Sequence, residues 1–217
     1  MITTINVMSI VQTKATATSI RHLNTLLDYL HTNPNTSTLC RKSDMIIKMH
    51  SDGSHLHVQG QRSRSAGHFC CGNKISMQQD EPYHGDVYQE CITIKPLVTS
   101  ATECGTVTLF LNFRTMIVIR ITTKELGHPQ PLRPTREDKT TTNNFMCNNL
   151  QQKKSKSFNM RLHWLRDQIK NRQFETHYMK GEFNYAEYYS KHHTEAHHKK
   201  IRPTCLASHV SGLQNVH

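Results

Sequence analysis

The sequence predicts an α/β protein in which a mixed β-sheet carries helices on both faces. Three β-prone segments come first, over 44–50, 65–71 and 90–97, and helices then alternate with two further strands. Strands that follow one another directly pair antiparallel, whereas strands joined through a helix pair in parallel. A run of strands followed by α/β alternation therefore indicates one mixed sheet covered by helices.

The helices and the later strands have sequence signals of their own. The segment Ser100-Ala-Thr-Glu103 has the pattern of a capping box, and Gly127 with Pro129 supplies a stop, so the strongest helix spans 100–126. Apolar residues at helical spacing give 19–30 and 157–171 one apolar face each. The remaining predictions are strands over 132–137 and 173–179 and a last helix over 183–193.

Charge is the most unusual feature of the composition. The 217 residues suffice for one domain, with a modest core at 35% hydrophobic content, and the formal net charge is +11. Residues 150–217 hold 12 Lys and Arg against 5 Asp and Glu, a net +7. Binding to phosphates releases condensed counterions, so a basic surface favours a nucleic-acid partner. No sustained basic amphipathic helix indicates a membrane surface.

The cysteines and apolar stretches suggest a compartment. The seven cysteines form no C-x-x-C pair, and the N-terminus lacks the pattern of a signal peptide. The apolar stretch 107–121 is interrupted by Asn112, Arg114 and Arg120, so we expect no membrane span. These features favour reduced thiols in a cytoplasmic or nuclear protein.

Four carboxylates fall at predicted junctions between elements. Asp52 ends the first strand, Glu103 lies in the first turn of the long helix, Asp138 follows the fourth strand, and Glu187 is near the start of the last helix. Two divalent cations about 4 Å apart need oxygen ligands that converge from different elements. These four residues are therefore candidate metal ligands.

Spacing alone leaves a structural alternative open for each acid. Asp52 in Ser-Asp-Gly is also an ordinary turn residue, and Glu103 is also the capping-box partner of its helix. Asp138 forms a solvated pair with Glu137 in the alternative interpretation. Glu187 is then a helix-start charge favoured by the helix dipole.

The acids lie in motifs that continue along the chain. These motifs read Leu26-Leu-Asp-Tyr-Leu, Ser43-Asp-Met, His50-Ser-Asp-Gly-Ser54, Arg62-Ser-Arg-Ser-Ala-Gly-His-Phe69, Ser100-Ala-Thr-Glu103, Thr135-Arg-Glu-Asp-Lys-Thr140, Trp164-Leu-Arg-Asp167 and Asn184-Tyr-Ala-Glu-Tyr188. In this order, over roughly residues 18–206, the sequence resembles the RNase H region of copia-type LTR retrotransposon polyproteins.

The resemblance implies a fold and an activity. The fold is RNase H-like, a five-stranded mixed sheet flanked by helices on both faces. The activity is hydrolysis of the RNA strand of RNA–DNA hybrids with Mg²⁺, or with Mn²⁺ in its place. Asp52, Glu103 and Asp138 correspond to the family's catalytic metal ligands, and Glu187 stands at the fourth position. Hybrids are recognised by shape and by 2′-hydroxyls.

The resemblance also implies how the chain is divided. Residues 1–17 form a disordered tail, 18–43 a connection-like helical segment, 44–206 the RNase H-like domain and 207–217 a second disordered tail. A polymerase, which precedes this domain in the family, is then supplied by another chain.

Basic residues in the motifs are candidate nucleic-acid contacts. Those that we predict are Arg62, Arg64, Lys153, Lys154, Lys156 and Arg161, although a lysine run is also typical of a solvated loop. The stretch from His192 to His198 matches the family's basic tail. The i, i+4 spacing of His193 and His197 would also suit a zinc pair on a helix.

Several positions depart from the family's pattern. Lys139 stands where Asn usually follows the third acid, Gly105 replaces a second Glu, and Glu187 replaces Asp. An ammonium competes with a cation for a carboxylate, and Mg²⁺ tolerates altered geometry poorly. Three functions therefore stay open: an active hybrid-specific endonuclease, an inactive RNase H fold that binds nucleic acid, and a partly folded relic.

Overall fold

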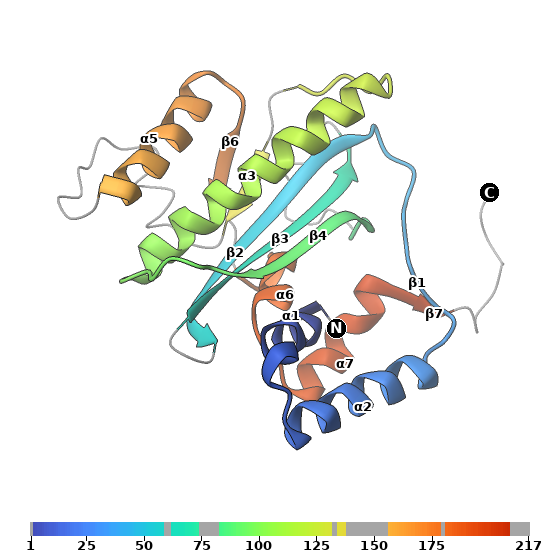
Figure 1. The fold of residues 1–217 in the computed structure, drawn as a ribbon. Coiled ribbons are helices and arrows are strands. Elements are labelled where there is room, and N and C mark those ends of the chain that lie inside the picture. Colours follow the sequence, from blue (N-terminus) through green and yellow to red (C-terminus); the bar gives the residue numbers. More distant parts are fainter. Residues whose placement is uncertain are drawn as a thin grey trace.

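A computed structural model describes residues 2–58, 62–73, 83–131, 134–137, 156–178 and 181–208 of the chain. Its centre is a five-stranded sheet with the strand order β4-β3-β2-β5-β6 (Figure 1). Strands β2, β3 and β4 form an antiparallel meander, whereas β5 runs parallel to β2 and β6 runs parallel to β5. The strands are β2 (Ile46–Val58), β3 (Arg62–Gly72), β4 (Asp86–Thr93), β5 (Pro134–Glu137) and β6 (Glu175–Tyr178).

One face of the sheet is covered by helices α3 (Ala101–Glu125) and α5 (Lys156–Lys170). Ile47 and Met49 of β2 are fully buried there against Leu109 and Phe113 of α3. The ring of Phe113 also stacks on Phe174 with a centroid distance of 4.0 Å. This cluster is the main hydrophobic core, and it fixes which side of β2 faces α3.

Helix α3 begins as the sequence predicts. The Ser100 side chain accepts a hydrogen bond from the N–H of Glu103, which satisfies one of the unpaired donors of the first turn. By length and composition α3 could cross a membrane, contrary to our expectation from its interrupting polar residues. Half of that apolar window is buried inside the protein, so packing on the sheet accounts for its composition.

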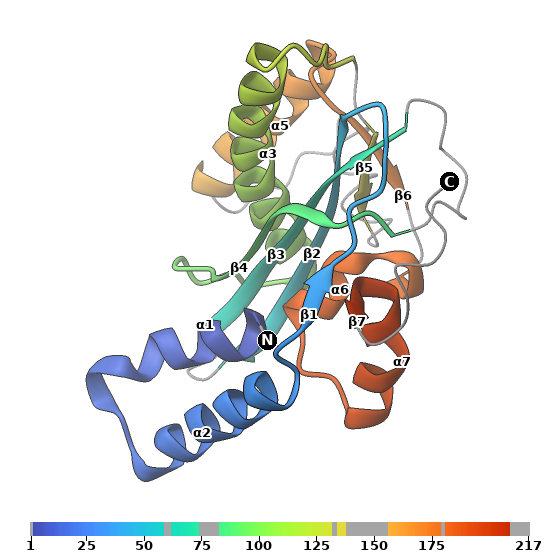
Figure 2. The ribbon, with the colours of Figure 1, turned by 90° about the vertical axis from the view of Figure 1, so that its right-hand side faces the viewer.

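The opposite face carries α6 (Tyr185–Ser190), α1 (Ile2–Val11), α2 (Ala17–Thr32) and α7 (Glu195–Cys205), as Figure 2 shows. A small two-stranded sheet joins β1 (Thr36–Thr38) to β7 (Leu206–Ser208). This pairing brings the segment that follows α2 beside the end of the described chain. The predicted α/β class and the presence of helices on both faces are confirmed.

Local parts of the structure differ from the sequence predictions. Residues 2–11, predicted within a disordered tail, form helix α1, because the Thr3 hydroxyl donates a buried hydrogen bond to the Tyr189 carbonyl and anchors the segment. Strand β2 does not end at Asp52 but continues to Val58 through pairing with β3. Helix α7 and the strands β1 and β7 were not predicted. The domain boundaries at 18 and 44 stay predictions.

Replacement of Phe113 by alanine tests the main core. We expect a loss of about 3–5 kcal/mol in the free energy of unfolding, because the cavity removes the contact with Phe174. Val118→Ala on the exposed side of α3 is the matched control, with an expected change within about 0.5 kcal/mol. Urea denaturation followed by circular dichroism measures both, and equal losses would contradict this orientation of α3.

Candidate active site

The carboxylate of Asp52, in the central strand β2, is the centre of the candidate site. Asp52 is only 2% exposed, and one carboxylate oxygen, Oδ2, accepts a hydrogen bond from the Ser190 hydroxyl at the end of α6. The other oxygen, Oδ1, is buried without a hydrogen-bond partner among the residues that the structure describes. A buried carboxylate is costly unless its charge is compensated, so Asp52 needs a cation nearby.

Lys191 supplies a cation directly after α6. Its ammonium lies 2.6 Å from Oε1 of Glu187 and 4.0 Å from Oδ2 of Asp52. A Cβ atom at Gly181 would lie only 2.9 Å from the other carboxylate oxygen of Glu187, so the glycine leaves room for this side chain. The structure thus places two of the four predicted metal ligands, Asp52 and Glu187, beside the same lysine ammonium.

Two polar side chains hold α6 over β2. Asn184 caps the helix by accepting a hydrogen bond from the N–H of Ala186, and its own amide donates to the Ser51 carbonyl at 2.9 Å. From β3, the Arg64 guanidinium donates to the Ser190 carbonyl at 3.2 Å. These bonds fix both ends of a six-residue helix, so Glu187 and Lys191 are held beside Asp52.

Glu103 is positioned differently. Its carboxylate accepts hydrogen bonds from the N–H and the hydroxyl of Thr99, at 2.7 and 2.8 Å, and so serves the start of its own helix. Only one of the two hydrogen bonds of the predicted capping box is therefore formed. The Ser100 hydroxyl accepts from the N–H of Glu103, whereas the Glu103 carboxylate accepts from Thr99 rather than from the N–H of Ser100. Gly53, the neighbour of Asp52, packs on α3, where a Cβ would lie 3.1 Å from the Cys104 sulfur.

The strand pleat explains why Glu103 and Asp52 do not share a contact here. Successive side chains of β2 point to opposite faces, so Gly53 faces α3 while Asp52 faces α6. The third predicted acid, Asp138, lies outside the described residues, as does Lys139. Strand β5 ends at Glu137, which is in register with Ser51, the residue before Asp52.

The donor chemistry around Asp52 fits a divalent cation. Asp52 and Glu187 offer the hard oxygen ligands that Mg²⁺ prefers, and the buried Oδ1 of Asp52 has capacity for another partner. No cluster of three or more metal-ligating side chains occurs within the described ranges. A divalent ion at this position would therefore be held by Asp52 and Glu187 and would compete with the Lys191 ammonium.

The predicted nucleic-acid contacts have different outcomes. Arg64 is wrong as a surface contact, because it is 1% exposed and burial lowers the pKa of its guanidinium. The half-buried Arg62 donates a hydrogen bond to the Lys95 carbonyl. Arg161, also half-buried, lies over the Phe110 ring at 5.9 Å. Lys153 and Lys154 lie outside the described residues, and the contact predicted for Lys156 stays a prediction.

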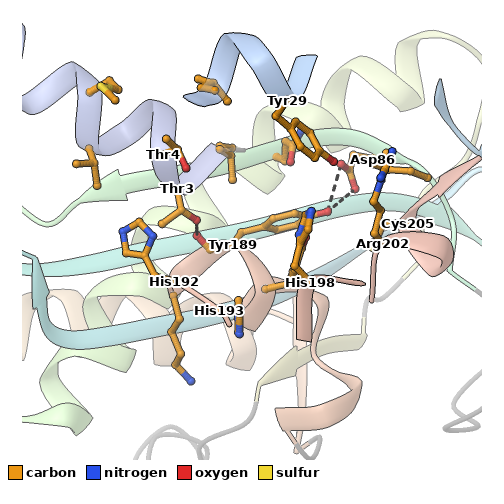
Figure 3. Close-up of a pocket in the computed structure, with 18 of the residues that line it drawn as sticks. Thr3, Thr4, Tyr29, Asp86, Tyr189, His192, His193, His198, Arg202 and Cys205 are labelled. Carbon is orange, nitrogen blue, oxygen red and sulfur yellow. Dashed lines mark hydrogen bonds between the residues drawn. The ribbon is translucent and has the colours of Figure 1, made fainter. Parts of the chain in front are cut away.

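A pocket of about 680 Å³ lies next to the acidic site, between the N-terminal and C-terminal helices. Its wall includes Lys191 and Asp86, whose carboxylate accepts hydrogen bonds from the hydroxyls of Tyr83, at 2.7 Å, and Tyr189. Dashed lines in Figure 3 join Tyr189 to Asp86. Burial raises the pKa of both tyrosines, so both hydroxyls stay protonated as donors.

Histidines of the C-terminal stretch also line this pocket (Figure 3). The rings of His193 and His198 lie nearly parallel to that of Tyr188, with interplanar angles of 18° and 10°. Burial raises the pKa of Tyr188 to about 12. His193 precedes α7 rather than sharing a helix with His197, and their rings stack at 4.3 Å. The helical zinc pair considered from the sequence is therefore not formed.

The sequence predicted no role for Asn184, Ser190 or Lys191, although Asn184 begins one of the motifs that resemble the family. The i, i+4 spacing of Glu187 and Lys191 was the one available signal, because such pairs meet on a helix surface. Nothing in the sequence indicated that the same ammonium also reaches the buried carboxylate of Asp52.

No protein-family model matches the chain, and no curated protein matches it. The solved structures that resemble it include the N-terminal RNase H domain of a Mycobacterium tuberculosis protein, solved as a fusion with maltose-binding protein. That domain is 10% identical with a TM-score of 0.44, over 67% of this chain and 91% of its own. RNase H1 from the archaeon Halobacterium salinarum is 10% identical with a TM-score of 0.42, over 64% and 89%.

A third similar structure is LC11-RNase H1 in complex with an RNA/DNA hybrid, also 10% identical. Its TM-score is 0.44, over 66% of this chain and 92% of that one. At this identity and with TM-scores below 0.5, the three similarities do not assign a family.

The histidines predict how stability depends on pH. Burial lowers the pKa of His193 and of His198 below the ordinary value of 6.5. Because the unfolded chain then takes up protons more readily, this contribution to stability is fully present above pH 6.5. It is lost as the pH falls below 6.5 and through the lower pKa of the folded protein. We expect the melting temperature to fall between pH 7 and pH 5. In the double variant His193→Gln/His198→Gln, the fall should be smaller, and an unchanged fall would contradict the assignment.

Proposed function

We propose that the chain is an RNase H-like domain of copia-type retrotransposon origin that cuts the RNA strand of RNA–DNA hybrids with Mg²⁺, or with Mn²⁺. The supporting observation is the buried Asp52 carboxylate in the central strand, with Glu187 brought beside it by α6. The motifs around both acids resemble the corresponding motifs of that family.

In this proposal the residues around Asp52 have distinct tasks. Asp52 and Glu187 would hold the cation, which would supply activation of a water and neutralisation of charge on the phosphodiester. Ser190 orients one carboxylate oxygen of Asp52 by donating its hydroxyl. Arg64 positions Ser190 through the backbone carbonyl, so its function is structural rather than substrate binding. Glu103 would join the ligands only after release from Thr99.

The basic C-terminal third would supply the nucleic-acid surface. Its net charge of +7 is suited to phosphate contacts that are independent of sequence. The exposed Lys199 of α7 and the half-buried Arg161 of α5 are described residues that belong to this third. A polymerase supplied by another chain, and a cytoplasmic or nuclear location, complete the proposal.

A second candidate is an RNase H-like domain that binds hybrids without cutting them. Two observations favour it: the Lys191 ammonium lies at the acid pair, and the Glu103 carboxylate is bound to Thr99. Both arrangements oppose metal binding, whereas neither affects the basic surface.

A cleavage assay separates the two candidates. Labelled RNA–DNA hybrid is incubated with the purified chain and Mg²⁺ or Mn²⁺, alongside Asp52→Asn, which keeps the size of the side chain and removes its charge. We expect the wild type to cut the RNA strand. The variant should lose about 10²–10³-fold in rate, because it lacks one charged ligand of the cation; at tenfold per 1.36 kcal/mol, this loss is about 3–4 kcal/mol of barrier. Hybrid affinity should not fall in the variant.

The other outcomes are equally informative. Salt-sensitive hybrid binding with no cleavage by either protein would select the binding function. Equal cleavage by both proteins would reject Asp52 as a ligand and indicate a contaminating nuclease. A broad melt without a cooperative transition would reject both candidates in favour of a partly folded relic.

A further inference from the structure

The ion pair between Lys191 and Glu187 differs from an ordinary helix-surface pair. Its two charged atoms are 2.6 Å apart, and the side chains are 31% and 30% exposed. The same i, i+4 spacing and the same 2.6 Å distance occur in α7 between Lys199 and Glu195, which are 73% and 80% exposed. The α7 pair is a solvated contact of the kind that contributes little to stability.

What distinguishes Lys191 is its second partner. Its ammonium also lies 4.0 Å from Oδ2 of Asp52, whose side chain is 1% exposed. A charge interaction with a buried group is screened far less by water and salt than one at the surface. Lys191 therefore compensates a buried charge that has no other cation within 4 Å among the described residues.

The Lys191 ammonium already lies against one oxygen of each carboxylate that a divalent ion would bind. Glu187 Oε1 and Asp52 Oδ2 face Lys191, and the Ser190 hydroxyl occupies a further position on Oδ2. An ammonium and a divalent cation between the same two carboxylates repel each other. The buried Oδ1 of Asp52 has no hydrogen-bond partner among the described residues.

We infer that Lys191 is a built-in counter-ion of the acidic site, so that a divalent cation binds Asp52 and Glu187 only when the Lys191 ammonium leaves them. This inference rests on the proposed metal site. The side chain has space to move, because Lys191 is partly exposed and lines the neighbouring pocket. Lys191 is thus a residue that lowers metal affinity.

The inference is tested by Mn²⁺ binding to the full chain, measured by isothermal titration calorimetry without nucleic acid. Lys191→Met keeps most of the stem and removes the charge, so its dissociation constant for Mn²⁺ should fall about tenfold or more below that of the wild type. Lys191→Arg keeps the charge and should bind as weakly as the wild type. Lys199→Met, from the matched exposed pair, should leave the affinity unchanged.

The controls separate this inference from the proposed function. In Lys191→Met/Asp52→Asn the gain should disappear, because the ligand itself is altered. Wild-type and Lys191→Met proteins that bind Mn²⁺ equally well would overturn the counter-ion inference and leave the metal site standing. If neither binds Mn²⁺ while both melt cooperatively, the metal site and the inference fail together.

A measurement on the wild type covers the case in which Lys191→Met does not fold. With lysine side chains isotopically labelled, titration with Mg²⁺ should shift the Nζ resonance of Lys191 and leave that of Lys199 in place. Equal, small shifts of both lysines at saturating Mg²⁺ would overturn the displacement of Lys191.

Discussion

A carboxylate buried on the central strand of a sheet needs a compensating partner, and Asp52 determines how the surrounding elements are arranged. Its neighbours on the α6 face are a hydroxyl from Ser190 and an ammonium from Lys191. Both come from the same helix end, so the electrostatic requirement of one strand residue is met by a segment about 140 residues later. The close packing of α6 on β2 and β3 follows from this requirement together with the Asn184 cap.

Because side chains alternate along β2, one face of the sheet carries the hydrophobic core and the other carries the candidate site. Ile47 and Met49 face α3 and provide the hydrophobic core that holds the sheet together. The alternate positions of β2 face α6 and carry polar side chains, including His50 and Asp52. Burying polar groups on one face is tolerated because the other face supplies apolar burial. Stability and the candidate site therefore come from opposite sides of the same strand.

Local signals predicted the elements well where the chain's own sequence determines them. The cap at Ser100 and the stop at Gly127 place α3, and apolar spacing places α2 and α5. The end of β2 could not be predicted, because Ser-Asp-Gly is a turn pattern that is kept extended by pairing with β3 and, at Ser51, with β5. Helix α1 has no amphipathic pattern and is held by the tertiary contact from Thr3 to Tyr189.

The site was predictable to a smaller extent than the fold. Asp52 and Glu187 lie together, as the family resemblance implied, whereas Glu103 bonds to its own helix start. The burial of Arg64 and the double contact of Lys191 depend on long-range packing that no local pattern encodes. The charge of a residue is visible in a sequence, but the partner that neutralises it is not.

In our proposal, Asp52 and Glu187 form a divalent-cation site from which Lys191 must be displaced. A crystal of the wild-type chain soaked in Mn²⁺, with anomalous scattering recorded for manganese, would locate both the cation and the lysine. We expect an anomalous peak between the two carboxylates, within coordination distance of Asp52, and a Lys191 side chain turned away. A Lys191 ammonium still bridging both acids at high Mn²⁺, with no peak beside them, would contradict it.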